Sequence, residues 1–491
     1  MCETHTAIVF FADDRAYKVK KPVDLGFLDY TTRAARRTAC AREVALNRRF
    51  APDVYLGLGE FRGPGAETPE PLVVMRRMPA GRRLSRLVQE GAALDEVLRA
   101  VARHLAAWHA DAPRGPDVAE QGTRDALSSR WEASFAQVHA LADDGSVPDG
   151  VTEAERLVRR YLACREPLFA SRIEQGRVVD GHGDLLAEDI FCLDDGPRVL
   201  DCLEFDDRLR HVDGLDDAAF LAMDLEQLGA PEAAAYFLAQ YGEYSGDPAP
   251  ASLWHHYVAY RAFVRAKVSL IQAHQGAPGA RTAARRLVST TLRHLRTSAV
   301  SLTLVGGLPG SGKSTLSGAL ADRLGVTLLS SDRVRKELAG IPAERSAAAG
   351  YGEGLYTPEW TTRTYTALLD RAAALLSAGE SVVLDATWSD TARREAARRV
   401  AERTGADLVA LRCRVPDEVS AARLSARAPG PSDAGPDIAA AMAAREPAWP
   451  EAVAVDTGGP LDSAVARALA AVRPWGTGQA PVFRRPYMEP D

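Results

Sequence analysis

The chain has 491 residues, of which 46% are hydrophobic and 26% are charged, and its formal net charge is −6. This length predicts two or three domains with sizeable cores, and the composition excludes disorder over most of the chain. The acidic balance gives the chain no overall attraction to nucleic acid or to an anionic membrane.

The six cysteines form no CxxC pair. Neither a zinc site nor a disulfide framework is therefore indicated, and a reducing cytoplasm is the expected location. The first residues, MCETHTAIVFFADD, contain no basic segment ahead of an apolar one, and no apolar run approaches the ~18 residues of a membrane span. We therefore expect a cytoplasmic protein with no membrane segment. The sequence carries no signal for an oligomeric state.

The first part of the chain alternates strand and helix signals and then becomes mainly helical from about residue 84 to 298. Short apolar runs separated by Gly and Asp interrupt the helical pattern at 176–205, where a loop and small strands are expected. We predict one domain over 1–298, with a β-rich small lobe (1–80) and a helical lobe (81–298). In the small lobe, strands are expected at 4–11, 15–23, 54–61 and 71–78, and a helix at 31–50.

The stretch DGHGDLLAEDIF at 180–191 has the spacing of a kinase catalytic loop. In the template H-R-D-x-x-x-x-N, the Asp receives and orients the acceptor hydroxyl and the Asn holds magnesium. On this template Asp184 is the predicted base and Asp189 a magnesium ligand. Asp201 follows the apolar run RVL and is the second predicted ligand. The transferred phosphoryl group arrives with bound magnesium, so more than one acid is needed there.

A lysine on a strand and a glutamate on a helix complete such a site. AYKVKKP places Lys18 and Lys20 on one face of a strand, and REVAL places Glu43 in the next helix. We expect Glu43 and one of the two lysines to hold ATP, with Lys20 preferred over Lys18. Taken singly, lysines on a strand are usually a solvated face. The order of all these elements carries the prediction.

These motifs resemble the aminoglycoside phosphotransferase-like (choline kinase-like) family over residues 4–270, including RAYKVKKPVDLGFLDYTT and LDCLEFDDRLRHVDGLDDAAFLAMDLE. The resemblance implies a bilobal, protein kinase-like fold and ATP-dependent phosphorylation of a hydroxyl group. Two departures stand out. Asp189 replaces the Asn of the family's HGDxxxxN signature. In addition, no glycine-rich loop precedes the first expected strand, which corresponds to the second strand of such a lobe.

A second domain is expected from about residue 299 to 491, where strand runs alternate with helical segments in the pattern of a parallel sheet. GGLPGSGKST follows the first of these strands and opens a helix. It satisfies the P-loop pattern, whose backbone N–H groups and helix N-terminus hold phosphates. In it, Lys313 reaches the β- and γ-phosphates and Ser314 binds magnesium. The predicted ATP-binding residues of this loop are Gly307, Gly310, Ser311, Gly312, Lys313, Ser314 and Thr315.

Further charged residues follow the expected strands. Asp332 comes just after VTLLSS and is the predicted base, with Arg335 three residues later as an ATP-site residue; a helix N-cap is the alternative for Asp332. Asp385 ends the strand SVVLD and is a predicted magnesium ligand or a plain strand-end residue. Arg423 and Arg427, at i and i+4, enter a lid near 423–437 and clamp the phosphate, or form a solvated helix face.

This second domain resembles the small-molecule and polynucleotide kinase group of P-loop proteins over about 301–475. We expect ATP and Mg²⁺ as cofactors and a small hydroxylated metabolite as acceptor. The acidic balance disfavours nucleic acid, although the Arg-rich stretch 391–405 keeps a polynucleotide acceptor open. The leading hypothesis is a two-domain ATP-dependent phosphotransferase. The alternatives are a single active C-terminal kinase with a regulatory N-terminal domain, and a non-enzymatic ATP-binding stress or signalling switch.

Overall fold

The computed structural model describes residues 1–3, 6–24, 28–63, 68–141, 148–342, 345, 353–426, 436–444 and 447–473. The chain divides into two compact units, and each unit is described by itself. Unit 1 comprises Met1–Val151, Phe169–Pro248 and His256–Leu292, and unit 2 comprises Thr152–Leu168, Ala249–His255 and Arg293–Asp491. Unit 2 therefore includes two short segments from the middle of the chain in addition to the C-terminal part.

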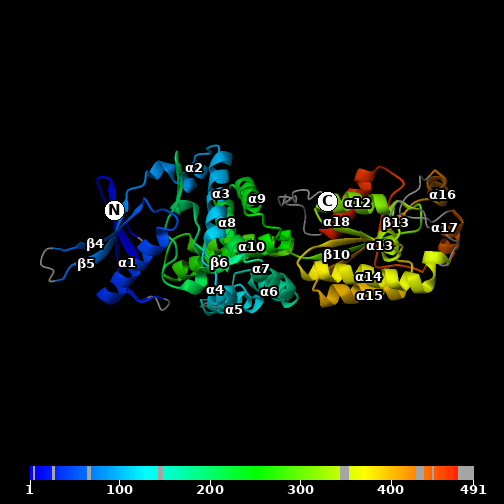
Figure 1. Ribbon diagram of the computed structural model, residues 1–491, viewed down its shortest axis with the longest axis horizontal. Coiled ribbons are helices and arrows are strands. Elements are labelled where there is room, and N and C mark those ends of the chain that lie inside the picture. The colour runs from blue at the N-terminus through cyan, green and yellow to red at the C-terminus, as the bar shows by residue number, and fades with distance from the viewer. Residues whose placement is uncertain are drawn as a thin grey trace. The chain divides into compact units, whose positions relative to one another are not determined.

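Unit 1 opens with a five-stranded antiparallel sheet in the order β1-β2-β3-β5-β4 (Figure 1). The four strands predicted from the sequence are present, and a two-residue edge strand, β1, precedes them. In β3 every second residue is buried, because side chains alternate between the faces of a sheet, and both lysines lie on the buried face. The strands are β1 (Cys2–Glu3), β2 (Ala7–Ala12), β3 (Arg15–Lys20), β4 (Tyr55–Phe61) and β5 (Glu70–Arg76).

Helix α1 (Arg33–Asn47) packs against this sheet. It begins after Thr32, whose side chain accepts a hydrogen bond from the Ala35 backbone nitrogen at 3.1 Å and so satisfies one free donor of the first turn. Val44 of the helix shares a core cluster with Val73 of β5 and with Leu200. The same buried face carries Glu43, which is therefore directed toward the sheet rather than toward solvent.

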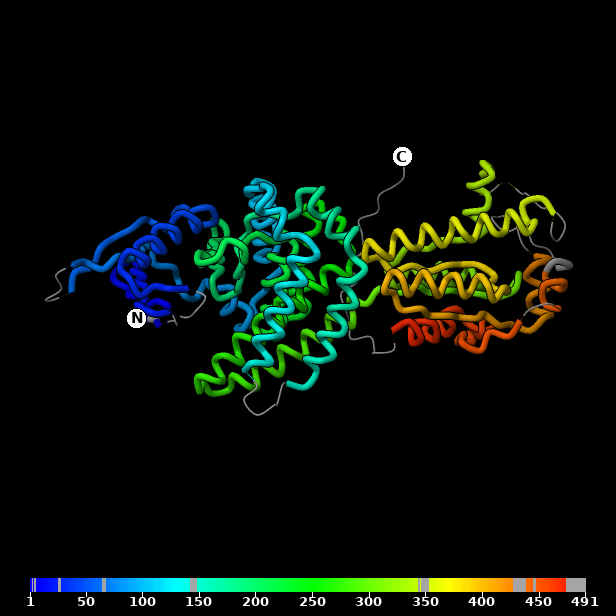
Figure 2. The backbone as a smooth tube through the Cα atoms, turned by 90° about the horizontal axis from the view of Figure 1, so that it is seen from below, coloured from blue at the N-terminus to red at the C-terminus, as the bar shows by residue number. Residues whose placement is uncertain are grey.

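The remainder of unit 1 is mainly helical, as the sequence predicted. In Figure 2 its cyan and green helices follow the blue segment that holds the sheet. Two small antiparallel pairs, β6 with β9 and β7 with β8, flank the loops that contain 181–189 and 200–210. These strands are β6 (Val178–Asp180), β7 (Ile190–Leu193), β8 (Gly196–Val199) and β9 (His211–Asp213). Some of the helices between β5 and the second sheet contain residues of both units. These helices are α2 (Leu84–Gln89), α3 (Asp95–Asp111), α4 (Pro116–Gln121), α5 (Arg124–Ala140), α6 (Val151–Ala163), α7 (Glu166–Glu174), α8 (Gly214–Gln227), α9 (Pro231–Ser245), α10 (Ala251–His274) and α11 (Ala280–Thr297).

Unit 2 is built on a parallel five-stranded sheet in the order β11-β12-β10-β13-β14, which confirms the predicted α/β class. Its strands are β10 (Ser301–Gly306), β11 (Thr327–Ser330), β12 (Val382–Asp385), β13 (Asp407–Arg414) and β14 (Val453–Asp456). The helices that follow them are α12 (Lys313–Leu324), α13 (Ser331–Leu338), α14 (Pro358–Ser377), α15 (Thr391–Arg403), α16 (Asp417–Ser425), α17 (Pro436–Ala443) and α18 (Leu461–Val472).

Helices cover both faces of this sheet. On one face, Leu316 and Leu320 of α12 and Val465 of α18 pack with Val305 and Leu411 of the central strands. Helices α14 and α15 lie on the opposite face from α12 and α18 (Figure 1). With both faces buried, the carboxyl ends of the strands form the open edge, which is where ligands bind in sheets of this kind.

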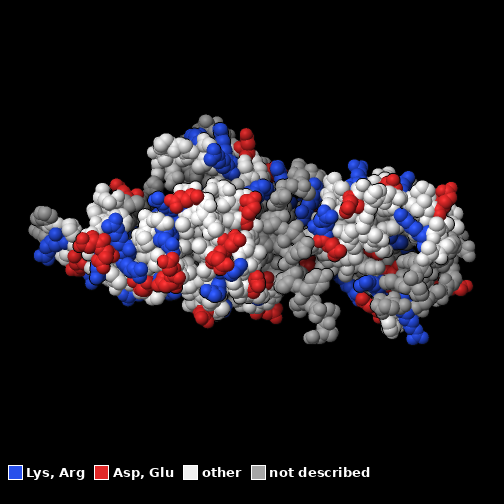
Figure 3. All heavy atoms as spheres, turned by 90° about the horizontal axis from the view of Figure 1, so that it is seen from above, with Lys and Arg blue, Asp and Glu red and all other residues white. Residues whose placement is uncertain are grey.

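None of the described helices is both long and apolar enough to cross a membrane. On the face drawn in Figure 3, basic and acidic side chains are interspersed, with no extended area of one sign in view.

Candidate active sites

The predicted lysines, Glu43 and Asp201 of unit 1 come together in one ionic cluster. The Glu43 side chain is completely buried. One of its carboxylate oxygens lies 2.9 Å from Nζ of Lys18, and the other lies 2.6 Å from Nζ of Lys20. Lys18 also contacts Asp201 at 2.5 Å. Lys20 instead pairs with Glu204, a residue that the sequence interpretation did not select. The cluster therefore joins β3 and α1 to the loop after β8.

The two lysines occupy different positions within this cluster. Lys20 is 2% exposed, and its partner Glu204 also accepts a hydrogen bond from the Tyr30 hydroxyl at 2.9 Å, so Lys20 is enclosed by partners. Lys18 pairs with Asp201, whose side chain is 47% exposed. Burial alone would lower the pKa of Lys18, but Asp201 and Glu43 raise it well above its usual value. Geometry thus favours Lys18, not the preferred Lys20, as the lysine next to a ligand.

Three predicted carboxylates of unit 1 influence one another electrostatically. Burial, followed by the charges of Asp201 and Asp184, raises the pKa of Asp189 well above its usual value. Burial also raises the pKa of Asp184 to about 6. Asp201 has a positive φ of 63°, an uncommon conformation for a residue other than glycine and a form of strain that clusters at functional sites.

This donor set fits a magnesium ion. In the described residues no group of three or more His, Cys, Asp or Glu side chains has the arrangement of a metal site. Mg²⁺ is usually held by one or two carboxylates together with substrate phosphates and water, so Asp189 and Asp201 would suffice. Burial is the main cause of the raised pKa of Asp189, and a divalent cation would offset the further rise that comes from the charges of Asp201 and Asp184.

The loop that carries Asp184 is anchored by a residue that the sequence interpretation missed. Asp217, in the first turn of α8, accepts hydrogen bonds from the backbone nitrogens of His182 at 2.6 Å and Gly183 at 2.9 Å. His109 of α3 contacts the same carboxylate at 3.2 Å. Although burial would raise the pKa of Asp217, the contact with His109 and the other partners hold it below its usual value. The sequence signal that could have indicated Asp217 is the pair of adjacent acids at the start of an apolar helix, DGLDDAAF.

Asp217→Ala should lower the free energy of unfolding by about 3–5 kcal/mol, because the buried donors of the loop lose their acceptor. A carboxyl group whose pKa is lowered by folding stabilises above its unfolded pKa, and this contribution is lost as the pH falls through the folded value. We expect the free energies of unfolding of the parent chain and of Asp217→Ala, measured in urea, to differ by a constant amount between pH 7 and 5. This difference should narrow below about pH 4. A difference under about 1 kcal/mol at pH 7 would contradict the anchoring role.

In unit 2 the predicted P-loop connects β10 to α12 through glycines that no other residue could replace without strain. Gly310 and Gly312 have positive φ values of 80° and 81°. A Cβ at Gly310 would lie 2.6 Å from the Ser420 backbone oxygen. The Ser311 hydroxyl is buried and has no hydrogen-bond partner within the described part of the chain. Lys313 and Ser314 open α12, and Ser314 and Thr315 are exposed.

The carboxyl edge of the sheet brings Asp385 beside this loop. In the parallel register, Asp385 at the end of β12 lies opposite Val305 of β10 on one side and Ser330 of β11 on the other. It is 5% exposed. The P-loop, Asp385 and the start of α13 therefore share one edge, as the sequence pattern predicted for parallel strands.

Asp332 is not a helix cap. The N-cap position of α13 is Ser330, and Asp332 is the second residue of the helix, so the N-cap alternative is wrong. Its carboxylate pairs with Arg335 one turn later at 2.8 Å. Arg335 is 6% exposed and stacks on the ring of Tyr356 at 4.6 Å. The pair fixes the orientation of the Asp332 side chain.

Arg423 of α16 lies against the P-loop. It donates a hydrogen bond to the Thr457 backbone oxygen at 2.8 Å, and the Thr457 hydroxyl donates to the Ser311 backbone oxygen at 2.5 Å. A Cβ at Gly312 would lie 3.3 Å from the Arg423 guanidinium. Arg427 and the greater part of the predicted lid lie outside the described residues.

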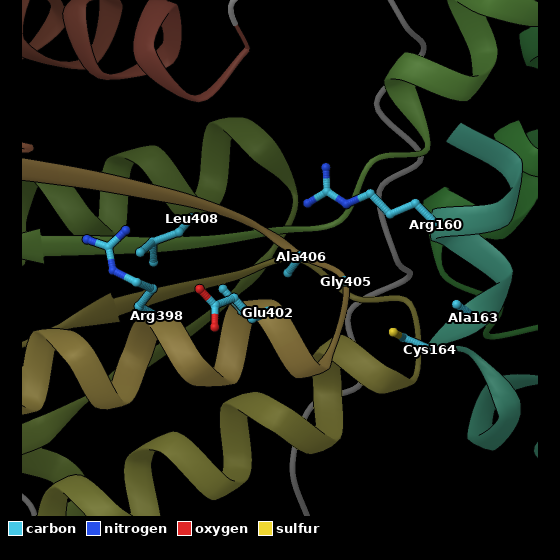
Figure 4. Close-up of a pocket in the computed structure, with 9 residues that line it drawn as sticks. Arg160, Ala163, Cys164, Arg398, Glu402, Gly405, Ala406 and Leu408 are labelled. Carbon is cyan, nitrogen blue, oxygen red and sulfur yellow. The ribbon is translucent and has the colours of Figure 1, made fainter. Parts of the chain in front are cut away.

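A pocket of about 450 Å³ in unit 2 lies apart from these residues (Figure 4). It is lined by Arg160 at the end of α6 and by Cys164 just after that helix, and by Arg398, Glu402 and Gly405 of α15 and the following turn. Arg160 is paired with Asp407 at 2.7 Å. No residue predicted to bind ATP or metal lines this pocket, so it is not part of the site described above.

Comparison with known proteins finds one family model that matches the P-loop part of the chain. The model of the AAA domain family matches residues 302–446, which confirms the predicted P-loop domain. Two similar proteins, the uncharacterized proteins Rv2004c of Mycobacterium tuberculosis and Mb2027c of Mycobacterium bovis, are each 44% identical to the chain over 466 residues, covering 95% of this chain and 94% of theirs.

Solved structures are similar to single parts of the chain. A gluconokinase from Sinorhizobium meliloti covers 35% of this chain and 91% of its own, with 22% identity and a TM-score of 0.26. A choline kinase from Cryptosporidium parvum covers 60% of this chain and 88% of its own, with 9% identity and a TM-score of 0.40.

Proposed function

The chain belongs to the family of the mycobacterial proteins Rv2004c and Mb2027c, and we propose for it an ATP-dependent phosphotransferase function with a kinase site in each unit. The observation that carries this proposal is the open edge of the unit 2 sheet, where a P-loop meets Asp332 and Asp385. The acceptor is a hydroxyl group of a small metabolite. The described cysteines, Cys40, Cys164, Cys192, Cys202 and Cys413, are all free thiols, which supports a reducing cytoplasm.

At the unit 2 site, the backbone N–H groups of the P-loop and the N-terminus of α12 bind the phosphates of ATP. Lys313 holds the β- and γ-phosphates, and Arg423 approaches the loop from α16. Ser314 and Asp385 would hold magnesium, which supplies charge neutralisation for the transferred phosphoryl group. Asp332, oriented by Arg335, accepts the proton of the attacking hydroxyl.

At the unit 1 site, Lys18 binds phosphate oxygens and Glu43 positions Lys18, while Asp189 and Asp201 would hold magnesium. Asp184 accepts the proton of the acceptor hydroxyl. Its position depends on Asp217, which fixes the backbone of the loop just before it. In this assignment Lys20 has a structural task, because its charge is already balanced by Glu43 and Glu204.

The whole chain is the right material for testing the proposal, since unit 2 includes segments from the middle of the sequence. Lys313→Ala should abolish Mg-ATP binding at the P-loop and leave one Mg-ATP site per chain, measured by isothermal titration. Two sites in the parent chain and one in the variant support two kinase units. A Lys313→Ala chain that binds no Mg-ATP would restrict the kinase function to unit 2.

That restricted version is the second candidate, and Asp189 is the observation that favours it. An Asp in place of the Asn of the family signature adds negative charge beside the phosphates, and unit 1 would then regulate the P-loop kinase. For a polynucleotide acceptor the structure offers less support. Arg398 and Arg399 of the Arg-rich helix α15 lie next to Glu395, one turn earlier, so part of its charge is already balanced.

Lys18→Met should weaken Mg-ATP binding at the unit 1 site by about 10–100-fold, the usual value of a hydrogen bond to a charged group. The measurement uses the Lys313→Ala chain, in which this site is the one that remains. Lys20→Met should chiefly lower the free energy of unfolding, because it leaves the carboxylate of Glu204, whose side chain is 11% exposed, without its cation. Lys21→Met, at a lysine that pairs with Glu3, is the matched control and should change neither quantity. Equal losses of ATP affinity from Lys18→Met and Lys20→Met would contradict the assignment.

A further inference from the structure

Helix α10 carries two arginines one turn apart, Arg261 and Arg265, at the loop that holds Asp184. Arg261 is 5% exposed, and three nitrogens of its guanidinium group donate hydrogen bonds. It makes two parallel contacts with Asp216, at 2.8 and 3.0 Å, and donates to the Gly183 backbone oxygen at 3.2 Å. It also lies over the ring of Phe220, 4.8 Å from the ring centre. Arg261 is therefore a structural residue that fixes α10 against the catalytic loop.

Arg265 lies on the same face of the helix, because residues four apart are neighbours on a helix surface. It is half-buried, yet among the described residues its side chain has no hydrogen bond, ion pair or ring contact. An arginine normally finds a carboxylate when one is near, and here two are near. The charge of Arg265 acts on Asp184 and on Asp224, in each case lowering a pKa that burial raises.

Asp224 helps to locate Arg265 relative to the loop. Its carboxylate accepts a hydrogen bond from the Ala187 backbone nitrogen at 2.8 Å, so Asp224 is held at the loop three residues beyond Asp184. Arg265 thus lies near both acids without being neutralised by a direct pair with either. Its guanidinium keeps five donors available next to the predicted base, where a half-buried cation without a partner is costly.

We propose that Arg265 binds an anionic group of the acceptor, a carboxylate or a phosphate monoester, while the acceptor hydroxyl is held at Asp184. The proposal rests on the kinase function proposed for unit 1 and names the class of its substrate. The planar fork of a guanidinium matches both kinds of anion with two parallel hydrogen bonds. A neutral polyol would leave Arg265 without a partner, so the site discriminates against it.

The transfer itself is balanced by groups already named. The acceptor oxygen forms a bond to the γ-phosphorus of ATP, and the bond between that phosphorus and the bridging oxygen breaks. ADP leaves with the electron pair, and the proton of the acceptor hydroxyl passes to Asp184 and then to solvent. Arg265 takes no part in these bonds. It is a specificity residue that acts through the position of the acceptor.

The test uses the full chain with Lys313→Ala, so that only unit 1 transfers phosphate. Acceptors are offered in matched sets that share a carbon skeleton: the polyols glycerol, ribitol and sorbitol, the acids glycerate, ribonate and gluconate, and glycerol 3-phosphate and ribose 5-phosphate. ADP release and phosphorylated product are measured for each. We expect at least one anionic acceptor to exceed its polyol by 10-fold or more in kcat/KM. The acid and the phosphate arms distinguish the two kinds of anion.

Arg265→Ala should then raise KM for that acceptor by about 10–100-fold with kcat changed less than about 3-fold, and Arg265→Lys should restore part of the loss. Arg281→Ala, at an exposed arginine of α11, is the matched control. A preference for anions that survives Arg265→Ala, or a neutral acceptor that is used equally well, overturns the proposal.

Two further outcomes are separated by binding measurements on the same chain. If Mg-ATP gives no thermal shift with Lys313→Ala, the kinase function of unit 1 fails and the substrate class fails with it. If Mg-ATP binds but no acceptor reacts, inorganic phosphate is the probe. Phosphate should raise the melting temperature of the chain more with Arg265 than with Arg265→Ala. Equal shifts would show that Arg265 binds no anion and would overturn the proposal.

Discussion

Asp332→Asn should reduce phosphoryl transfer at the P-loop site by ~10²–10⁴-fold while Mg-ATP still binds, because an amide cannot accept the proton of the attacking hydroxyl. Asparagine has the size of aspartate, so the phosphate-binding loop and α12 are not disturbed. The measurement combines Mg-ATP titration with product formation from the acceptor panel, in a full chain whose transfer at the unit 1 site is reduced by Asp184→Asn. Retention of near-full transfer would show that Asp332 is not the base, and Asp385 would be the next candidate.

The pair between Asp332 and Arg335 requires a control for stability. Asparagine leaves the buried Arg335 without its carboxylate, and this should lower the free energy of unfolding by about 1–3 kcal/mol. Urea unfolding of the variant measures that cost directly. Ser330→Ala is the matched control for the helix end, because Ser330 occupies the N-cap but makes no capping hydrogen bond with its side chain. It should leave both transfer and stability nearly unchanged.

Asp184→Asn should reduce transfer at the unit 1 site by a similar ~10²–10⁴-fold, but its effect on stability should have the opposite sign. Burial raises the pKa of Asp184 to about 6, so its carboxylate destabilises the folded chain at neutral pH. Without magnesium, the free energy of unfolding of the variant at pH 7 should be about 1–2 kcal/mol higher than that of the parent chain, after allowance for partial solvent access. The difference should disappear near pH 3, about one unit below the usual Asp pKa, where the carboxyl group is protonated in the folded chain and largely protonated in the unfolded one.

This combination separates a catalytic role from a structural one. A residue that merely holds the loop together would lose stability on substitution, as expected for Asp217→Ala. Loss of transfer together with a gain in stability is the pattern of a group that is kept charged for chemistry. A variant with unchanged transfer, or one that is destabilised at pH 7, would remove Asp184 from the role of base.

The P-loop could be predicted from the sequence because its parts are contiguous. Gly307 to Ser314 form one short segment between a buried strand and a helix, and the positive φ values of Gly310 and Gly312 are a local property of glycine. The same holds for Lys18 and Lys20, since alternation along a strand places both on one face. The parallel sheet of unit 2 followed in the same way from strand runs alternating with helical segments.

Contacts between distant segments decided what the sequence left open. Lys18 and Asp201 are 183 positions apart, and only the packing of β3 and α1 against the loop after β8 determines that Lys18, rather than Lys20, meets Asp201. Asp217 anchors a loop 34 positions earlier through backbone donors that no side-chain pattern records. That Arg265 has no partner among the described residues is likewise visible only when its neighbours are in place. Sequence periodicity determines which face a side chain occupies, whereas its partners depend on the tertiary packing of elements that are remote in the chain.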